Sequence, residues 1–422
     1  MTILSRKTLT ARGVRDLYGE NIEIFNYIIN IAKKVALNAD FEEISTPIFE
    51  FSEVFERNLG ANSDIISKEV YKFSDRSNNF LTLRPEFTAG VIRSFVNNGD
   101  LNQYLPQKLF SFGPLFRYER PQKGRQRQFH QVNFENIGIK SSLVDAELIS
   151  LAYRFLKNLN LQNKSTLQIN SLGCEETKHK YQKELVLYLN KYQKDLSEDS
   201  KVRLLKNPLR ILDSKNTKDI EIVLDAPEIK NFYSKDAAIN FEKILNMLTK
   251  LNIDFIVNQK LVRGLDYYTS TVFEFTTTSI GAQDTILAGG RYDSLIKNMG
   301  GGDIPASGFA AGIERIMLLS EIEKTKKNPT SIIFISPNEE QYAATLAHEL
   351  RNSDIHIKIY HGLSFKKQMK LASKDNSKYV LIIGENEVKN NDISVKNFQN
   401  SQTIKIHRTK LNNFLQQNAM AN

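Results

Sequence analysis

The sequence predicts a protein of two parts: a large α+β part that a helical insertion interrupts at about 174–250, and a small α/β part at 330–422. Three observations support this prediction. The first 325 residues mix helical and strand periodicity, residues 174–250 are rich in Lys and Glu and read as helical, and strand and helix patterns alternate after Pro329. The length of 422 residues fits about two to four domains.

The first elements follow from the spacing of apolar residues. Between Asn21 and Asn38 apolar residues recur at helical spacing, which predicts an amphipathic helix. The stretch from Phe41 to Phe51 is expected to be extended, because Pro47 would break a helix. Further strands are predicted at 79–83, 108–118 and 129–139, and a helix at 145–159.

Strand patterns return after the insertion. Strands are predicted at 261–275 and 285–288, and a Gly-rich stretch leads to a helix predicted at 306–324. The charged segment 323–329 is expected to be a linker. The C-terminal part has the pattern of a small α/β domain, with strands at 331–336, 355–360 and 379–383 and helices at 339–352 and 365–373.

Composition and missing motifs exclude several classes of protein. The net charge of +9 is compatible with a polyanionic partner, although charge alone does not establish one. The single cysteine, Cys174, excludes an internal disulfide framework and paired-cysteine zinc sites, and no metal site is predicted. No signal peptide and no apolar run of about 18 residues is found, so we expect a cytosolic protein without a membrane segment. Any nucleotide would bind on a scaffold other than these, because the sequence has no P-loop and no GxGxxG after a strand.

The densest group of polar and aromatic residues lies in a predicted hairpin at 116–135. Because alternate side chains of a strand share a face, Arg117 and Glu119 are expected to point the same way. Such a face can bind phosphate, stack a base and hold an ammonium group. A solvent-exposed amphipathic hairpin with a charged turn is the alternative. The residues expected to share the face of the returning strand are Phe129, Gln131, Asn133 and Glu135.

Two later segments are further candidates. LVRGLDYY at 261–268 places Arg263 before a glycine and two tyrosines, and a structural turn with core tyrosines is the alternative. Within 306–319, Gly308, Gly312 and Arg315 have the spacing of one helix face. Two glycines on one face let a backbone or a ligand come close, although tight helix packing would explain the same residues.

These segments together resemble the class II aminoacyl-tRNA synthetases, and in detail their histidine-specific branch. FRYER followed by RQRQFHQ resembles motif 2, LVRGLDYY resembles the histidine-specific signature, and GGRYD with ASGFAAGIER resembles motif 3. LTLRPEFTAG resembles the amino-acid-binding loop, with Phe87 where many bacterial members have glycine. FEEISTPIF resembles motif 1, whose proline, here Pro47, lies at a homodimer interface. The resemblance implies an α+β catalytic domain at 1–325, built on the antiparallel sheet of the class II fold, and a C-terminal α/β anticodon-binding domain.

The resemblance also implies how ATP is bound and activated. Arg117 would bind the α-phosphate, Phe129 would stack on adenine and Arg315 would bind the γ-phosphate. Glu119 and Arg125 match further ATP contacts, and Mg²⁺ is expected to accompany the outer phosphates. The expected catalytic residues are Arg117 and Arg263, since fixed cations at the α-phosphate offset the charge that develops there.

A pocket for histidine has to pair both ring nitrogens, because a neutral imidazole has one donor and one acceptor. Glu135 could pair with one nitrogen and Tyr268 with the other, while Glu86 and Thr88 match contacts to the α-amino group. The complete set that the resemblance implies for histidine is Glu86, Thr88, Arg117, Gln131, Glu135, Arg263, Tyr267, Tyr268 and Tyr292.

Contacts to tRNA are expected in two places, the tip of the hairpin and a basic helix of the C-terminal part. Lys366, Lys370 and Lys374 recur every four residues, and such a stripe suits RNA phosphates, although a solvated surface helix is the alternative. By analogy, the insertion would contact the acceptor arm. The residues expected to bind tRNA are Gln122, Lys123 and Arg127 in the hairpin loop and Lys366, Lys367 and Lys370 in the C-terminal part.

The expected activity is that of a histidine–tRNA ligase, which makes histidyl-adenylate from histidine and ATP and then transfers histidine to the 3′ end of its tRNA. One alternative is the synthetase-like regulatory subunit of ATP phosphoribosyltransferase, which lacks the anticodon-binding domain and erodes the catalytic arginines. Another is a synthetase for threonine, proline or glycine. Arg117, Arg263 and Arg315 favour an enzyme, as does the C-terminal part, and LVRGLDYY with Gln131 and Glu135 favours histidine.

Overall fold

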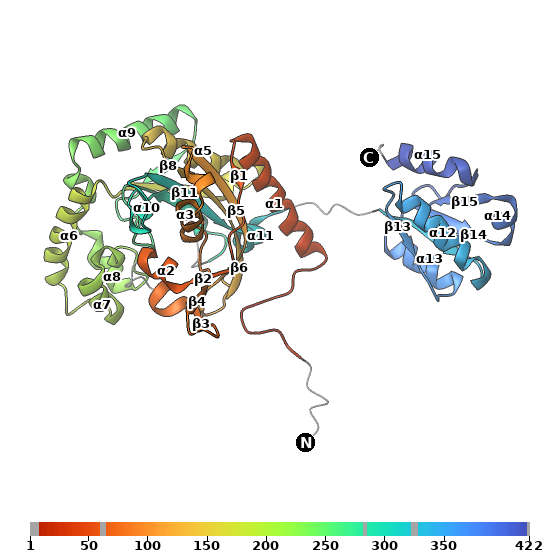
Figure 1. Cartoon of the computed structure of the whole chain (residues 1–422), viewed down its shortest axis with the longest axis horizontal. Coiled ribbons are helices and arrows are strands. Elements are labelled where there is room, and N and C mark those ends of the chain that lie inside the picture. Colours follow the sequence, from red (N-terminus) through yellow and green to blue (C-terminus); the bar gives the residue numbers. More distant parts are fainter. Residues whose placement is uncertain (1–7, 60–64, 282–284, 322–327, 420–422) are drawn as a thin grey trace, which may run out of the picture. The chain divides into compact units, whose positions relative to one another are not determined.

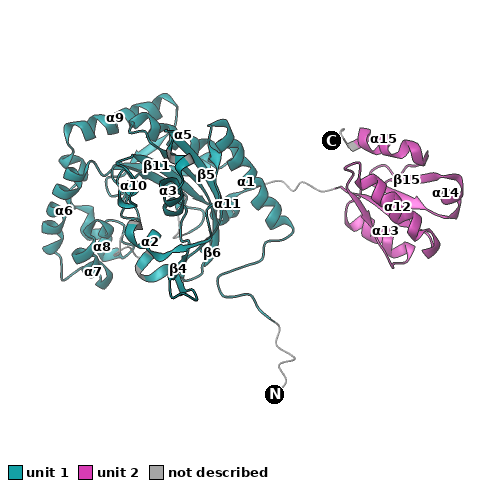
Figure 2. Cartoon of the chain, viewed as in Figure 1, with its two compact units in different colours: residues 1–322 teal, residues 323–422 magenta. Residues whose placement is uncertain are grey.

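The structure is a computed structural model of the whole chain, and it describes residues 8–59, 65–281, 285–321 and 328–419. Internal contacts divide the chain into two compact units, residues 1–322 (unit 1) and 323–422 (unit 2), which Figure 2 shows in different colours. The linker expected at 323–329 lies largely outside the described residues, as does the end of the helix predicted at 306–324. Within the described ranges, no helix is long and apolar enough to cross a membrane.

Unit 1 is built on a large sheet, in which the described residues form eight strands in the order β1-β5-β6-β11-β10-β9-β7-β8 (Figure 1). The outer pairs β1–β5 and β7–β8 are parallel, and the pairs between them are antiparallel. The α+β fold on an antiparallel sheet is therefore confirmed. The strands are β1 (Glu42–Glu43), β5 (Gln107–Phe116), β6 (Gln128–Ile137), β7 (Thr166–Ser171), β8 (Phe255–Val257), β9 (Thr271–Thr276), β10 (Thr285–Arg291) and β11 (Ala306–Gly312).

Helices cover one face of this sheet and form the main apolar core with it. Phe134 of β6 stacks on Phe309 of β11 in this core, with ring centroids 4.5 Å apart. Removal of such apolar surface from water is the force that holds the helices on the sheet. The helices predicted at 21–38 and 145–159 are confirmed as α1 and α5. The covering helices are α1 (Glu20–Asn38), α5 (Ser142–Asn158), α9 (Lys235–Lys250) and α11 (Ile313–Leu319).

The opposite face of the sheet carries the candidate site. A second apolar cluster borders this face and joins it to the insertion and to α2 (Ser52–Leu59), α3 (Thr88–Asn97) and α10 (Leu295–Asn298). A small antiparallel sheet lies between α1 and α3 in the sequence, with strand order β2-β4-β3. Its strands are β2 (Phe49–Phe51), β3 (Tyr71–Ser74) and β4 (Phe80–Leu83).

The region expected as a helical insertion is helical. Besides α9, it contains α6 (Glu175–Asn190), α7 (Glu198–Lys206) and α8 (Thr217–Leu224). The buried carboxylate of Asp219 organises this region, because its Oδ2 atom accepts hydrogen bonds from the hydroxyl groups of Ser197, Ser200 and Ser214 at 2.6, 2.7 and 2.6 Å. Ser197 also caps α7 by accepting a hydrogen bond from Ser200 N.

Two predictions of local structure after the insertion are wrong. The strand predicted at 261–275 is confined to its end, since β9 begins at Thr271 and the preceding residues form a loop. The helix predicted at 306–324 begins at Ile313, because 306–312 form β11 between β6 and β10. Gly308 and Gly312 therefore do not share a helix face with Arg315. Backbone pairing on both sides of β11 overrides the weak strand propensity of its Ala and Gly residues.

Unit 2 has its own sheet, in which the described residues form five strands in the order β13-β12-β14-β15-β16. The alternation predicted after Pro329 is confirmed. The buried amide of Gln368 ties α13 to β12, since it accepts a hydrogen bond from Phe334 N and donates one to Phe334 O, both at 3.1 Å. The elements are β12 (Thr330–Phe334), α12 (Glu340–Arg351), β13 (Ile357–Ile359), α13 (Phe365–Lys374), β14 (Tyr379–Ile383), α14 (Glu385–Asn390), β15 (Asp392–Asn397), β16 (Thr403–His407) and α15 (Arg408–Ala419).

Candidate active site

A cavity of about 660 Å³ lies over the open face of the unit 1 sheet. Its floor crosses four strands, because Asn133 of β6 is paired with Ala310, Ala310 with Ala288, and Ala288 with Glu274. Small side chains occupy the middle of this floor, and polar ones stand at its edges. This arrangement leaves room for a ligand and supplies groups that can orient it.

Most of the residues predicted to bind ATP or histidine line this one cavity, although they come from segments far apart in the sequence. Glu135 lies directly beside the lining and is fully buried. The predicted residues in the lining are Glu86, Thr88, Arg117, Glu119, Arg125, Phe129, Gln131, Arg263, Tyr267, Tyr268, Tyr292 and Arg315.

The hairpin contributes two guanidinium groups, a carboxylate and an aromatic ring. The prediction that Arg117 and Glu119 lie within the strand is wrong, since β5 ends one residue earlier. Their side chains still approach each other, with Arg117 Nη1 and Glu119 Oε1 4.0 Å apart, and Arg125 Nε is 2.6 Å from Glu119 Oε2. The Arg117 guanidinium lies 5.2 Å from the centroid of the Phe129 ring. A flat ring beside a cation can hold a base next to its phosphates.

Two further arginines are held in the cavity by oxygen atoms of the sheet and of the hairpin loop. Arg263 Nη1 donates to Glu274 Oε2 at 2.6 Å, and Thr285 Oγ1 donates to the same oxygen at 3.0 Å. Arg315 donates from Nε to Gly124 O at 3.1 Å and from Nη1 to Thr285 O. Together with Arg117, these guanidinium groups make the cavity suitable for a ligand with several negative charges.

Two buried polar atoms converge at the bottom of the cavity. Asn133 Nδ2 donates to Glu135 Oε1 at 2.9 Å, whereas Glu135 Oε2 and the Tyr292 hydroxyl have no hydrogen-bond partner among the described residues. A Cβ atom on Gly308 would lie 2.0 Å from this Oε2 and 2.7 Å from this hydroxyl, so both atoms lie close together over Gly308. A buried polar group without a partner costs about 1–3 kcal/mol, so a polar ligand group that pairs with them is expected.

The protonation of the two buried carboxyl groups depends mainly on burial. Burial raises the pKa of Glu135 to about 8, and hydrogen bonds from Thr88 and Asn133 only partly oppose this rise. Burial also raises the pKa of Glu86, although backbone N–H groups donate to it, Thr88 N at 2.6 Å among them. Glu135 therefore keeps its proton over most of the neutral range and can donate a hydrogen bond as well as accept one.

Three buried tyrosines form one wall of the bottom of the cavity. The ring centroids of Tyr267 and Tyr268 are 4.8 Å apart, and the ring of Tyr292 lies 5.4 and 6.1 Å from them. Burial raises the pKa of Tyr268 to about 12. Its hydroxyl group therefore stays protonated and remains a hydrogen-bond donor.

The tip of the hairpin is a tight turn. Gly124 has a φ angle of +73° there, a conformation that glycine adopts without strain. Gln122 and Lys123 are exposed, as expected of residues that meet a macromolecule. Arg127 is held differently, because its guanidinium group lies 3.9 Å from the centroid of the Tyr118 ring. In unit 2, Lys366, Lys367 and Lys370 are exposed on α13.

Several lining residues have no role in the sequence-based prediction. Glu274 holds Arg263 and is the one carboxylate in the strand sequence TVFEFT. A single charged residue in an otherwise uncharged strand could have marked it as a site residue. Glu314 accepts hydrogen bonds from His130 N and Nδ1 at 2.9 and 2.8 Å, and no sequence signal pointed to this pair. The insertion also contributes one wall of the cavity, and no residue pattern in the sequence pointed to it. Its lining residues are Ser197, Asp199, Arg203, Arg210, Asp213, Ser214, Lys215 and Asn216.

Comparison with known proteins decides the family. A family model described as histidyl-tRNA synthetase matches residues 13–316, and one described as anticodon binding domain matches residues 330–418. The chain belongs to the histidyl-tRNA synthetase family. The resemblance to the histidine-specific branch of the class II synthetases is thus confirmed, and so is the assignment of the C-terminal α/β part to the anticodon-binding type.

Individual synthetases of this family are similar to the chain over nearly its whole length. The histidine–tRNA ligase of Rickettsia bellii is 46% identical over 400 residues, which are 94% of this chain and 96% of that protein. The histidine–tRNA ligase of Wolbachia pipientis wMel is 49% identical over 393 residues, 93% and 96% of the two chains. The crystal structure of apo S. aureus histidyl-tRNA synthetase has a TM-score of 0.81 and 30% identity and covers 97% of this chain and 100% of that one. These similarities support a ligase over the regulatory alternative.

Proposed function

We propose that this chain joins histidine to its tRNA in two steps, activation by ATP to histidyl-adenylate and pyrophosphate, followed by transfer to the 3′ end of the tRNA. One observation carries the choice of amino acid. The partnerless Glu135 Oε2 and Tyr292 hydroxyl lie close together over Gly308, at the bottom of a cavity that several arginines line. These two atoms suit a polar ligand side chain, and the arginines suit ATP.

The imidazole ring would be selected by hydrogen bonds. Glu135 would pair with one ring nitrogen and Tyr268 with the other, and the Tyr292 hydroxyl offers a further partner. An analogue without these nitrogens would leave buried polar groups unpaired, and such sites reject analogues strongly. Glu86 and Thr88 would bind the α-amino group.

In the first step, an oxygen of the histidine carboxylate would attack the α-phosphorus as the bond to pyrophosphate breaks. Arg117 and Arg263 would offset the charge that develops on the α-phosphate oxygens, and Glu274 would hold Arg263 in the required orientation. Phe129 would stack on adenine. Arg125 and Arg315 would bind the outer phosphates.

Mg²⁺ is part of the proposal as a companion of ATP. This ion usually keeps several waters and binds one or two carboxylates together with substrate phosphates. Glu119 and Glu274 line the cavity and fit this need. In the described ranges, no group of three or more His, Cys, Asp or Glu side chains could hold a metal by itself, so the phosphates of ATP would provide the other ligands. When bound, the ion would neutralise charge on the outer phosphates.

For tRNA, we propose contacts at Gln122, Lys123 and Arg127 in the hairpin loop and at Lys366, Lys367 and Lys370 on α13. All but Arg127 are exposed in the structure, and exposed lysines attract phosphates. Arg127 would have to leave its contact with Tyr118 to reach RNA. A cytosolic location is also part of the proposal, because the chain has one free cysteine and no possible internal disulfide.

We also propose a homodimer, in which a second copy covers the small sheet β2-β4-β3. Register places Phe49, Phe51 and Phe73 on one face of this sheet, and these side chains are 53, 52 and 43% exposed. Exposed aromatic residues that share a face are typical of an interface. Sedimentation of the purified chain would test this, and a monomer at micromolar concentration would contradict it.

The decisive experiment is ATP–pyrophosphate exchange with each of the twenty amino acids in turn. Exchange that depends on histidine alone is expected, together with histidine-dependent charging of the matching tRNA. Exchange with threonine, proline or glycine would contradict the proposed pocket. Absence of exchange with every amino acid, from a folded protein that still binds histidine, would favour the regulatory alternative.

A further inference from the structure

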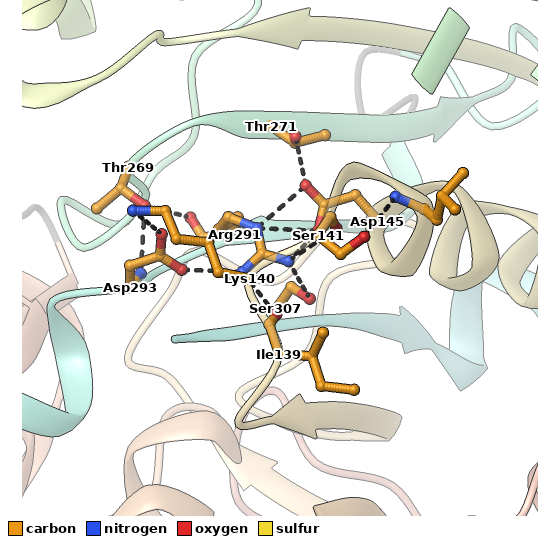
Figure 3. Close-up of polar contacts among 10 residues, drawn as sticks. Ile139, Lys140, Ser141, Asp145, Thr269, Thr271, Arg291, Asp293 and Ser307 are labelled. Carbon is orange, nitrogen blue, oxygen red and sulfur yellow. Dashed lines mark hydrogen bonds and ion pairs between the residues drawn. The ribbon is translucent and has the colours of Figure 1, made fainter. Parts of the chain in front are cut away.

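A buried ion pair lies on the helix-covered face of the unit 1 sheet, opposite the cavity (Figure 3). Arg291 Nη2 and Asp145 Oδ1 are 2.5 Å apart, and Arg291 Nε donates to both oxygens of Asp145 at 3.0 and 3.1 Å. The two residues are 3 and 5% exposed. Thr271 Oγ1 donates to Asp145 Oδ2 at 2.6 Å, so three elements, β9, β10 and α5, meet at this carboxylate.

Stability alone is a poor explanation for this pair. Desolvation of two charges offsets most of their attraction, and apolar residues of similar size often stabilise a fold as well or better. The geometry that the pair imposes on its neighbours is a better explanation. β10 reaches Arg291 through Gly289 and Gly290, and glycine is the residue with the greatest backbone freedom. The ion pair therefore adds a side-chain anchor to the backbone pairing that β10 has with β9 and β11.

The hydrogen bonds around Arg291 involve residues directly next to two tyrosines of the cavity, Tyr268 and Tyr292. Arg291 directly precedes Tyr292, and its Nη1 donates to Asp293 Oδ1 at 2.9 Å on the other side of that tyrosine. Asp293 N donates to Thr269 Oγ1 at 3.2 Å, and Thr269 N donates to Arg291 O at 2.9 Å. Thr269 directly follows Tyr268. Both tyrosines thus adjoin residues of this network in the sequence, and Figure 3 shows the contacts among Thr269, Arg291 and Asp293.

We propose that Asp145 and Arg291 are positioning residues for the histidine pocket, which hold Tyr268 and Tyr292 in place from behind the sheet. The inference rests on the proposed function, because it assumes that these tyrosines contact histidine. Neither Asp145 nor Arg291 would touch a substrate. A small shift of either one would move the tyrosine hydroxyls relative to Glu135 and leave the ATP end of the cavity unchanged.

The test uses Thr271 instead of the ion pair itself, because Asp145→Asn would leave a buried Arg291 without its main countercharge and would lower stability strongly. Thr271→Val keeps the shape of the side chain and removes the hydroxyl that orients Asp145. Thr271→Ser keeps that hydroxyl. The matched control is Thr276→Val on the same strand, because Thr271 and Thr276 are 4 and 7% exposed and each has a hydroxyl in a side-chain hydrogen bond. Thr276 does not line the cavity.

Steady-state ATP–pyrophosphate exchange would give separate KM values for histidine and ATP, and thermal unfolding would report stability. We expect Thr271→Val to raise the KM for histidine about fivefold and to change the KM for ATP less than about twofold. Thr271→Ser and Thr276→Val should keep the wild-type KM for histidine.

Equal KM values for histidine in Thr271→Val and Thr276→Val would overturn the inference, even if both variants unfold at lower temperature. A Thr271→Val enzyme with a lower kcat and unchanged KM values would overturn it as well, since that is the result expected of a purely structural role. These outcomes leave the proposed function intact. Wild-type protein without histidine-dependent exchange would instead overturn the proposed function, and this inference with it.

Discussion

Gly308 offers the sharpest test of the proposed histidine pocket, because the structure gives the cost of one added methyl group in detail. A Cβ atom on Gly308 would lie 2.0 Å from Glu135 Oε2, 2.4 Å from the carbonyl oxygen of Phe134 and 2.7 Å from the Tyr292 hydroxyl. Side-chain Cβ atoms essentially never come closer than 3.0 Å to another atom. The Phe134 carbonyl belongs to the backbone of a central strand and cannot retreat. In Gly308→Ala, the backbone of β11 would therefore have to shift, and Glu135 and Tyr292 would have to move as well.

The expected rise in the Kd for histidine follows from the hydrogen bonds that Glu135 and Tyr292 would lose. Overpacking a well-packed interior costs about 1–3 kcal/mol in the free energy of unfolding. Displacing Glu135 and Tyr292 would also remove two hydrogen bonds to histidine, at about 1.5 kcal/mol each. The sum of about 3 kcal/mol corresponds to a roughly hundredfold rise in the Kd for histidine. The KM for ATP should change little, because the arginines that line the cavity are not among the nearest neighbours of the new methyl group.

The assay is ATP–pyrophosphate exchange over a range of histidine concentrations, with thermal unfolding to show that the variant is folded. Gly312→Ala is the matched control on the same strand, because the nearest atom to its new Cβ is Arg315 Cδ at 3.7 Å, an ordinary contact. We expect Gly312→Ala to keep the wild-type KM for histidine. A folded Gly308→Ala enzyme whose KM for histidine stays within about threefold of wild type would refute the placement of the imidazole against Glu135 and Tyr292.

Three further predictions concern other parts of the site. Arg263→Ala should slow adenylate formation about a hundredfold or more with modest change in histidine affinity, and unchanged exchange would show that this cation is not used at the α-phosphate. Burial raises the pKa of Glu135 from 4.5 to about 8. The free energy of unfolding that this carboxyl group contributes is therefore present in full below about pH 4.5 and should be lost as the pH rises through about 8. Thermal unfolding of the ligand-free protein from about pH 6 to about pH 9 should therefore depend less on pH in Glu135→Gln, and equal slopes would contradict the raised pKa. Reversal of charge at Lys366 and Lys370 to Glu should weaken tRNA charging and its salt dependence without affecting exchange, and normal charging would remove α13 from the proposed tRNA surface.

Local patterns in the sequence predict part of this structure well. The two-residue period of β6 correctly placed Phe129, Gln131, Asn133 and Glu135 on one face, since a strand admits no other alternation. The apolar spacing of α1 and α5 likewise predicted those helices. The overall fold and the choice of site residues were predicted from the resemblance to a family, because residue spacing alone predicts neither.

The failures have a common physical cause, which is that distant segments decide the local structure. Residues 306–312 read as the start of a helix, yet β6 and β10 supply backbone partners on both sides and make them a strand. The segment before Thr271 contains apolar and aromatic residues typical of strands but forms the wall that carries Tyr267 and Tyr268. The insertion residues that line the cavity reach it through tertiary packing, which leaves no periodic trace in the sequence. The roles of individual site residues remain predictions.

The alternation along β6 restricts how this pocket can change over evolutionary time. Odd-numbered residues from 129 to 135 face the cavity, and Val132 and Phe134 between them face the helix-covered core. Deletion or insertion of a single residue in this strand would exchange the two sets, and would place a carboxyl group in the core and a phenylalanine in the pocket. A descendant with a new amino-acid preference could therefore arise by substitution along this strand, but not by a change in its length. Gap-free alignment across this strand is expected even among relatives whose substrates differ.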